Sequence, residues 1–79
     1  MNENVVRIMA ETFRVKESDI FPELAMEDMD EWDSLMHMEL IANLEEELGV
    51  EFDVDEITEM NTVTKVLSII EAKLNGNKE

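Results

Sequence analysis

The fold is decided by residues 32–49, which read WDSLMHMELIANLEEELG. Advancing by about 100° per residue from Ser34 brings one set of side chains onto a single arc of a helix. The members of this predicted core face are His37, Leu40, Ile41, Leu44 and Leu48. Ser34 is the expected N-cap, and Gly49 is suited to end the helix because glycine readily adopts the left-handed conformation. The sequence therefore predicts a helix from Ser34 to Leu48.

A second apolar strip lies on the same predicted helix, about a third of a turn or more from the centre of the core face. The strip and its flanking acids, together called the docking strip, are Leu35, Met38, Glu39, Ala42, Glu45 and Glu46. A helix that only packed inward would not need these apolar residues. Apolar side chains ringed by acids are typical of a surface that binds partner proteins. The alternative is that Leu35 and Met38 pack beneath the preceding loop.

An earlier helix is predicted from about Asn4 to Arg14, with Asn2 or Asn4 as its N-cap. The apolar side chains on its inward face are Val5, Val6, Met9, Ala10 and Phe13. The next segment, Lys16 to Asp33, has no clean helical period and contains the only proline, Pro22. We expect an ordered loop there, and the side chains expected to pin it are Ile20, Phe21 and Leu24.

Two helices are predicted after Gly49: a short one over about Asp55 to Met60 and a longer one over about Thr62 to Leu74. The candidate caps are Asp53 or Asp55 for the first and Asn61 or Thr62 for the second, which Gly76 follows. The expected inward side chains are Ile57 and Met60, then Val63, Val66, Leu67, Ile70 and Leu74. The fold predicted is all-α: one domain over residues 1–79, a small bundle of three longer helices and one short helix. The tail, Asn75 to Glu79, is expected to fray.

The chain is strongly acidic, with 21 acidic residues against 6 basic ones and a net charge of −15. From Glu17 to Thr64 there is no Lys or Arg at all. Such a surface repels nucleic acids and anionic membranes, and its natural complement is a protein with a basic patch. There is no cysteine, no apolar run near the roughly 18 residues that span a membrane, and no signal peptide. We therefore expect a cytoplasmic monomer that binds proteins.

Ser34 is a poor candidate for a catalytic nucleophile. The only histidine, His37, is three residues away, but it lies on the core face, so its side chain should point toward the core and not over Ser34. No glycine-rich oxyanion element or nucleophile elbow surrounds the serine. We therefore predict no catalytic residue and no enzymatic activity. The same position, at a helix start after a loop, would expose the hydroxyl to an outside enzyme.

A calcium site is the other chemistry that the carboxylates suggest. Asp28, Asp30 and Glu39 fall at the first, third and last ligand positions of an EF-hand-like frame. However, Trp32 stands where an oxygen ligand belongs, and Asp33 where glycine makes the turn. We therefore predict no specific metal site, although such dense carboxylates bind divalent cations weakly.

Several motifs together resemble the acyl carrier protein family. They are Trp32-Asp33-Ser34-Leu35, Glu39-Leu40-Ile41, Leu44-Glu45-Glu46-Glu47-Leu48-Gly49-Val50 with Phe52, and Thr62-Val63 at the start of the last helix. The resemblance runs from the first helix to Leu74, and the length and acidity also fit. It implies a four-helix bundle whose serine, here Ser34 between Asp33 and Leu35, carries a covalent 4'-phosphopantetheine arm.

The resemblance also implies partners. A phosphopantetheinyl transferase would attach the arm from coenzyme A with magnesium, and the thiol of the arm would hold acyl or aminoacyl groups as thioesters. The docking strip corresponds to the partner-recognition helix of the family, which loading and transferring enzymes would meet with basic patches. The implied protein is a stand-alone carrier in fatty-acid, polyketide or another biosynthesis.

Two departures from the fatty-acid pattern concern the pathway. Trp32 stands where fatty-acid carriers usually have glycine or alanine, and Met36-His37 stands where they have an acidic residue. The tryptophan form is similar to stand-alone carriers of specialised pathways. Two other classes stay open: an acidic interaction module of the same fold that is never modified, and a calcium-responsive regulator.

Overall fold

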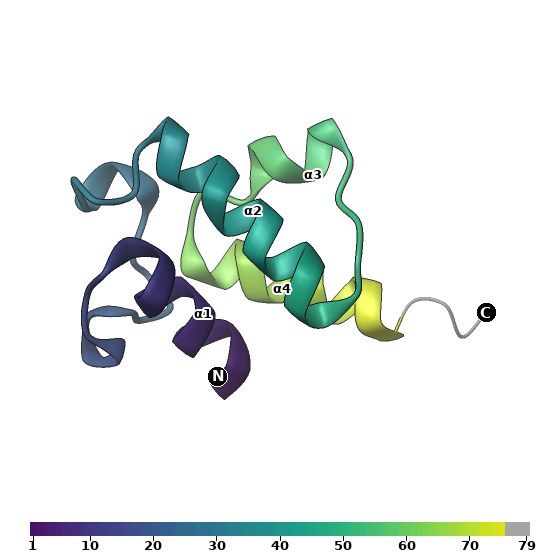
Figure 1. The fold of residues 1–79 in the computed structure, drawn as a ribbon, viewed down its shortest axis with the longest axis horizontal. Coiled ribbons are helices and arrows are strands. Elements are labelled where there is room, and N and C mark those ends of the chain that lie inside the picture. The colour runs from purple at the N-terminus through teal and green to yellow at the C-terminus, as the bar shows by residue number, and fades with distance from the viewer. Residues whose placement is uncertain (76–79) are drawn as a thin grey trace.

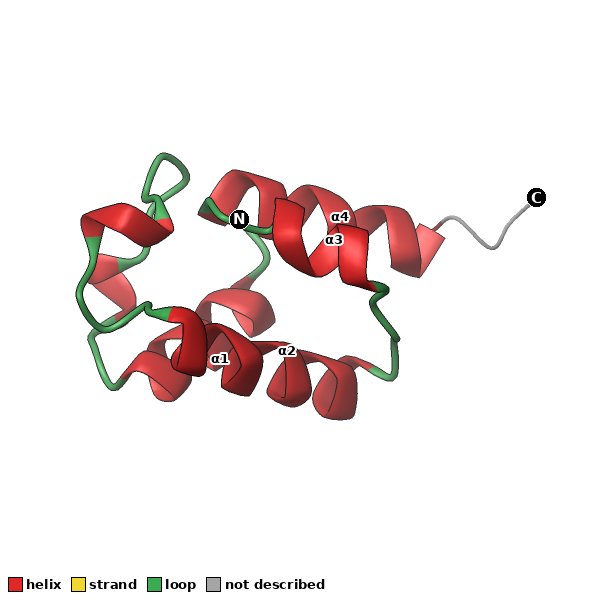
Figure 2. Cartoon of the chain, turned by 90° about the horizontal axis from the view of Figure 1, so that it is seen from above, coloured by secondary structure: helices red, strands yellow, loops and turns green. Residues whose placement is uncertain are grey.

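The computed structural model describes residues 1–75, and these residues form four α-helices and no strand. The helices are α1 (Glu3–Phe13), α2 (Ser34–Leu48), α3 (Val54–Glu59) and α4 (Val63–Asn75). Two short 3₁₀ turns, η1 (Glu17–Asp19) and η2 (Met26–Asp28), lie in the loop between α1 and α2. α1 packs along α2, and the short α3 packs on α4 (Figures 1 and 2). The predicted all-α bundle of three longer helices and one short one is confirmed.

The helix ends follow local chemistry, and one predicted cap is wrong. The Asn2 side chain accepts the backbone N–H groups of Asn4 and Val5, so α1 begins one residue earlier than expected. At α2 the cap is Asp33, whose Oδ1 accepts the N–H of Met36 at 2.9 Å. Ser34 is therefore the first helical residue of α2 and not its N-cap. A carboxylate is favoured over a hydroxyl there because it also meets the positive end of the helix dipole.

The other ends agree more closely with the sequence. Asp53 caps α3 in a capping box with Glu56, and Thr62 Oγ1 accepts the N–H of Lys65 in the first turn of α4. Gly49 ends α2 at φ 69°, in the left-handed region where glycine is unstrained. Asn75 belongs to α4, contrary to the frayed tail predicted from that residue. Gly76 and the rest of that tail lie outside the described residues.

The core is built from the inward faces of α1, α2 and α4. The predicted residues of α2 are placed correctly: His37, Leu40, Ile41 and Leu44 are buried, and Leu48 is half-buried against them. Two predicted core residues are wrong, since Leu74 is 48% exposed and Phe21 is 45% exposed. Leu74 lies in the last turn of α4, where the helix extends past the end of α2 (Figure 1). Phe21 follows an extended residue, Ile20, and neighbours along extended backbone point to opposite sides.

The loop between α1 and α2 is ordered, as predicted, and is held by backbone as well as by side chains. Ile20 and Leu24 are buried. The N–H of Met26 donates to the carbonyl of Asn61, and the N–H of Val63 donates to that of Leu24, both at 2.9 Å. These bonds flank an isolated antiparallel bridge between residues 25 and 62. They fix residues 24–26 beside residues 61–63.

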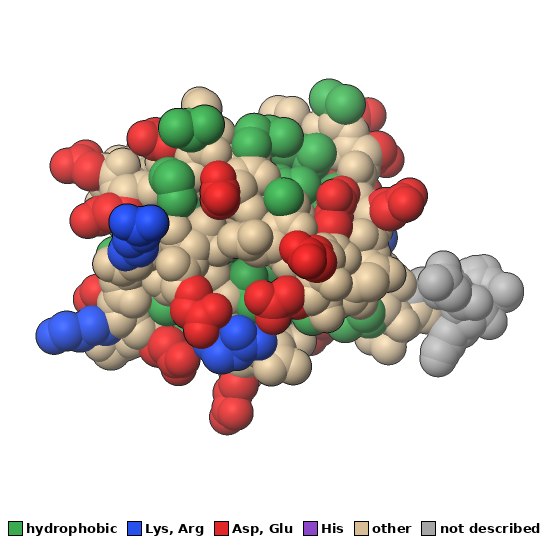
Figure 3. Space-filling model, viewed as in Figure 1, with side chains coloured by type: hydrophobic (Ala, Val, Ile, Leu, Met, Phe, Trp, Pro, Cys, Tyr) green, Lys and Arg blue, Asp and Glu red, His purple; other side chains and the backbone are tan. Residues whose placement is uncertain are grey.

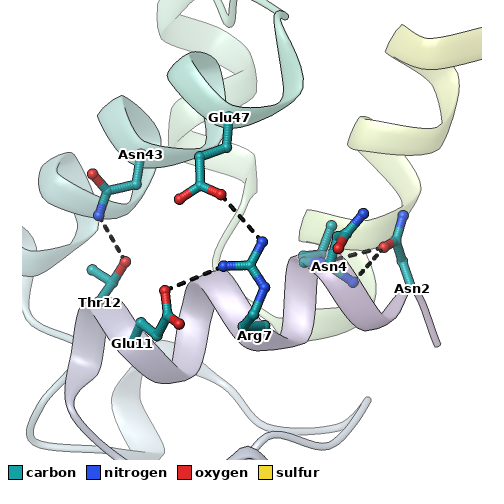
Figure 4. A network of polar contacts seen from close by, with 8 residues as sticks. Asn2, Asn4, Arg7, Glu11, Thr12, Asn43 and Glu47 are labelled. Atoms are coloured by element: carbon teal, nitrogen blue, oxygen red, sulfur yellow. Dashed lines mark hydrogen bonds and ion pairs between the residues drawn. The ribbon is translucent and has the colours of Figure 1, made fainter.

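Polar contacts also join the helices. Arg7 of α1 pairs with Glu11 and with Glu47 of α2, and the amide of Asn43 donates to Thr12 at 2.9 Å (Figure 4). Exposed ion pairs of this kind contribute little to stability, so the contacts to Glu47 and Asn43 mainly orient α1 on α2.

One ion pair ties α3 to α4. Lys73 Nζ lies 2.7 Å from Glu56 Oε1, which also accepts the N–H of Asp53 at 2.9 Å. The hydrogen bond from Lys73, and after it the one from Asp53, lowers the pKa of the Glu56 carboxyl.

Candidate functional site

Ser34 is exposed at the start of α2, and its hydroxyl makes no hydrogen bond with residues 1–75. The reason is the neighbouring cap: Asp33 satisfies the helix N–H that a capping serine would otherwise bind. The hydroxyl is therefore free to react with an outside enzyme. A phosphate ester at this place would also lie near the positive end of the α2 dipole.

A groove of about 740 Å³ lies beside Ser34. One wall comes from the loop around η2 and the other from the start of α4. The residues that line this Ser34 groove are Ala25, Met26, Glu27, Met29, Asp30, Trp32, Asp33, Ser34 itself, Asn61, Thr62 and Lys65. Its mixed apolar and polar lining suits a flexible, amphipathic chain attached to the serine. The arm implied by the resemblance therefore fits the residues that surround Ser34.

Trp32 and His37 form a buried pair behind the serine. Trp32 is 1% exposed, stacks on Phe13 with ring centroids 5.3 Å apart, and donates from Nε1 to His37 Nδ1 at 3.0 Å. Since indole can only donate, Nδ1 must accept, and the Nε2–H of His37 donates to the carbonyl of Ile57 at 2.9 Å. The predicted inward placement of His37 is confirmed. Both ring nitrogens are occupied, so His37 cannot act as a base for Ser34.

The sequence analysis missed the burial of Trp32. The signal was available: Trp32 precedes the cap of α2 and His37 is the fourth helical residue, which is the spacing of a hydrophobic staple.

The docking strip is largely solvent-facing. Leu35 is 74% exposed and Met38 is 52% exposed, so neither packs beneath the loop. Ala42, Glu39 and Glu46 are also exposed. In Figure 3, apolar side chains gather over α2 and α3, with acidic side chains beside and between them.

Two residues change the expected composition of this surface. Glu45 is half-buried, and its Oε2 accepts the N–H of Phe52 at 3.0 Å, so it also holds the loop after α2. Val54, which the sequence analysis did not select, is 77% exposed at the start of α3. Its only signal was an apolar residue directly after the cap Asp53.

The acids of the EF-hand-like frame do not converge. Asp28 lies in η2, where its carboxylate accepts the N–H of Ala25, while Glu39 lies more than a turn into α2. Within residues 1–75, no three acidic or histidine side chains are grouped as metal ligands.

Over the same residues, no helix is both long and apolar enough to cross a bilayer.

Comparisons with known proteins agree with this geometry. The family described as phosphopantetheine attachment site matches residues 3–70. An acyl carrier protein of Thermosynechococcus vestitus is 38% identical over 91% of this chain and 89% of its own length. An acyl carrier protein of Buchnera aphidicola is 34% identical over 92% and 91%. The solution structure of holo acyl carrier protein from Geobacter metallireducens superposes with a TM-score of 0.84, at 27% identity, over 95% of this chain and 86% of that one.

A four-helix bundle that matches a phosphopantetheine attachment family over residues 3–70 is a carrier domain for a covalent prosthetic group. The chain belongs to the acyl carrier protein family, whose cofactor is covalently attached phosphopantetheine. It is a carrier and not an enzyme, and the enzymes that it meets are acyl-handling ones.

Proposed function

We propose that Ser34 carries the phosphopantetheine arm and that the chain presents acyl or aminoacyl groups on that arm to enzymes of a specialised biosynthetic pathway. The observation that carries the assignment is the exposed Ser34 hydroxyl, left without a hydrogen bond because Asp33 caps α2. Ser18 and Ser68 are also exposed, but neither lies between an aspartate cap and a leucine at the start of a long helix.

Attachment requires an outside base. In the transfer, Ser34 Oγ forms a bond to the phosphorus of the phosphopantetheine part of coenzyme A. The pyrophosphate bond breaks, and adenosine 3',5'-bisphosphate leaves. The hydroxyl proton must go to the phosphopantetheinyl transferase, since both nitrogens of His37 are engaged. When bound, the arm supplies a thiol that holds the cargo as a thioester.

The docking strip is the proposed contact for the transferase and for loading and transferring enzymes. Leu35 and Met38 supply a small apolar centre, and Val54 extends it onto α3. Glu39 and Glu46 supply charge that speeds encounter with a basic patch. A small contact of this kind suits a monomeric cytoplasmic carrier that must release each partner after transfer.

The specialised pathway is supported by Trp32 and by Met36 and His37 after the serine. Trp32 is not a surface variation, because its indole packs on Phe13 and binds His37. The alternative is a bundle that only docks and is never modified.

The Ser34→Ala variant tests the assignment. Wild-type protein incubated with a phosphopantetheinyl transferase and coenzyme A should gain the mass of one phosphopantetheine group. Ser34→Ala should gain none while keeping its helical circular dichroism, and Ser18→Ala should behave as wild type. An arm that maps to Ser18 or Ser68 would refute the assignment. An unmodified Ser34 in the native cell, where a transferase is active, would favour the docking-only alternative.

A further inference from the structure

We propose that the Ser34 groove is the resting place of the phosphopantetheine arm and that Lys65 is the residue that holds the phosphate of the arm there. This inference rests on Ser34 being the attachment site. It adds a binding site for the arm on the side of Ser34 that faces η2 and the start of α4.

The groove is fixed before any arm occupies it. The backbone bonds from Met26 to Asn61 and from Val63 to Leu24 join its two walls. The hydroxyl of Thr64 also donates to the carbonyl of Pro22 at 2.7 Å. A chain lying in the groove therefore does not have to order the walls, which lowers the entropic cost of binding.

Charge decides which side of the groove the phosphate takes. The phosphodiester carries one negative charge, and its covalent attachment holds it in a groove that three carboxylates line, those of Glu27, Asp30 and Asp33. Among residues 1–75, Lys65 is the only basic residue that lines the groove. It is also the first cation after Lys16 in the sequence. The phosphate should therefore turn away from the three acids and toward Lys65.

The Lys65 side chain is available for this contact. It is exposed and makes no ion pair with the described residues. Glu59 shares a neighbouring depression with it but does not pair with it. The backbone N–H of Lys65 is bonded to Thr62 Oγ1, which fixes the residue in the first turn of α4.

The rest of the lining matches the rest of the arm. Beyond the phosphate, phosphopantetheine has a carbon that bears two methyl groups, then a hydroxyl and two amides. Met26 and Met29 are half-buried and offer flexible apolar contact to those methyl groups. Asn61 and Thr62 offer polar groups to the amides. Since Leu35 and Met38 do not line the groove, a resting arm leaves the docking strip uncovered for a partner.

The experiment uses the ¹³C-labelled 79-residue chain loaded with an unlabelled arm from coenzyme A. The chain has no cysteine, so a neutral alkylating reagent caps only the thiol of the arm and prevents dimers. Isotope-filtered NOEs should connect the two arm methyl groups to the methyl groups of Met26 and Met29 and to the side chain of Lys65. Lys65→Gln should lower the ratio of docked to free arm by roughly 1.4- to 5-fold, the range for an exposed ion pair. The matched variant Lys16→Gln removes the same charge away from the groove and should leave the NOEs unchanged.

Two results would overturn the proposal: arm NOEs confined to Leu35 and Met38 or absent, or equal losses in Lys65→Gln and Lys16→Gln. Intact mass and peptide mapping are measured first, because they show whether the arm is attached to Ser34. A failure of the resting place is thereby told apart from a failure of the attachment site. An arm on Ser34 without NOEs to the groove refutes only the resting place. An arm absent from Ser34 refutes both proposals.

Discussion

His37 lies between core residues of α2 and close to the start of the helix. Burying a polar ring there without hydrogen-bond partners would cost free energy of folding. The cost is avoided because the ring bridges the indole of Trp32 and the carbonyl of Ile57. It thereby links the residue before the cap of α2 to α3, two segments that are 20 residues or more apart in sequence. Removing the ring would leave a buried indole N–H unpaired, at about 1–3 kcal/mol.

We predict that this bridge restricts long alkyl cargo. A long chain that entered between α2 and α3 would have to displace the bond from His37 to Ile57 and bury hydrocarbon against a polar ring. Wild type and His37→Leu, each loaded with a short and a long acyl chain, should therefore differ. The long chain should shift the amide resonances of Leu40, Leu44 and Ile70 more in the variant.

His37→Gln is the control for this prediction, since it keeps polar groups at the same position and should stay close to wild type. Strong, length-dependent shifts in wild type that His37→Leu leaves unchanged would show that the ring is no barrier. The prediction that the bridge restricts long alkyl cargo would then be withdrawn.

At the scale of elements, α2 packs one face into the core and exposes the docking strip on another. Met38 is 52% exposed, and surface substitutions of this kind change stability by about 0.5 kcal/mol or less. Met38→Glu and Glu46→Lys should therefore slow arm attachment by a phosphopantetheinyl transferase without unfolding the protein. Leu44, with 0% exposure, should behave in the opposite way: Leu44→Ala should cost about 2–5 kcal/mol in denaturant unfolding.

Glu71→Lys is the charge control for this comparison, because Glu71 is exposed on α4 outside the docking strip. Glu45 is unsuitable as a docking probe, because Glu45→Lys would also remove the bond to Phe52. Unfolding of Met38→Glu, or equal slowing by Glu71→Lys, would contradict the assigned faces.

The contact between α3 and α4 should depend on pH. Lys73 lowers the pKa of Glu56 below its ordinary value of 4.5 in the folded chain. A lowered folded-state pKa means that the contribution of Glu56 to stability is present above 4.5 and is lost as the pH falls through the folded value. Glu56→Gln should therefore melt below wild type at neutral pH, and the two should converge in acid.

Glu51→Gln provides the matched control, since Glu51 is exposed and has no ion pair with the described residues. Thermal unfolding followed at neutral pH and again below the isoelectric point of about 4.1 avoids the region of low solubility. A difference between Glu56→Gln and wild type that stays constant over this range would contradict the assigned ion pair.

At the scale of the whole molecule, repulsion among carboxylates opposes folding. The chain has a net charge of −15, and only three ion pairs form within residues 1–75. Salt screens exposed charges with a Debye length of roughly 10 Å at 0.1 M. Raising salt, or adding magnesium or calcium, should therefore raise the melting temperature at pH 7. The effect should shrink as the pH approaches the isoelectric point, and a flat or falling melting temperature at pH 7 would contradict it.

The sequence by itself determined the four helices, most of the core and the serine at the start of α2. These features depend on local periodicity and on capping chemistry, which act over a few residues. Residues 34–48 were placed correctly as a helix because their apolar side chains recur at helical spacing. The choice between Asp33 and Ser34 as the cap could not be settled in this way, because both residue types are good caps and they are adjacent.

Only the tertiary structure decided which distant residues meet. The pairing of Leu24 and Met26 with the start of α4 uses backbone groups that every residue has, so no side-chain pattern marks it. The bond between His37 and Ile57, and the meeting of Lys65 with Ser34 at one groove, depend on how the loop and α3 pack. Exposure at Phe21, Val54 and Leu74 was decided in the same way, because burial depends on what lies opposite a side chain and not on its hydrophobicity.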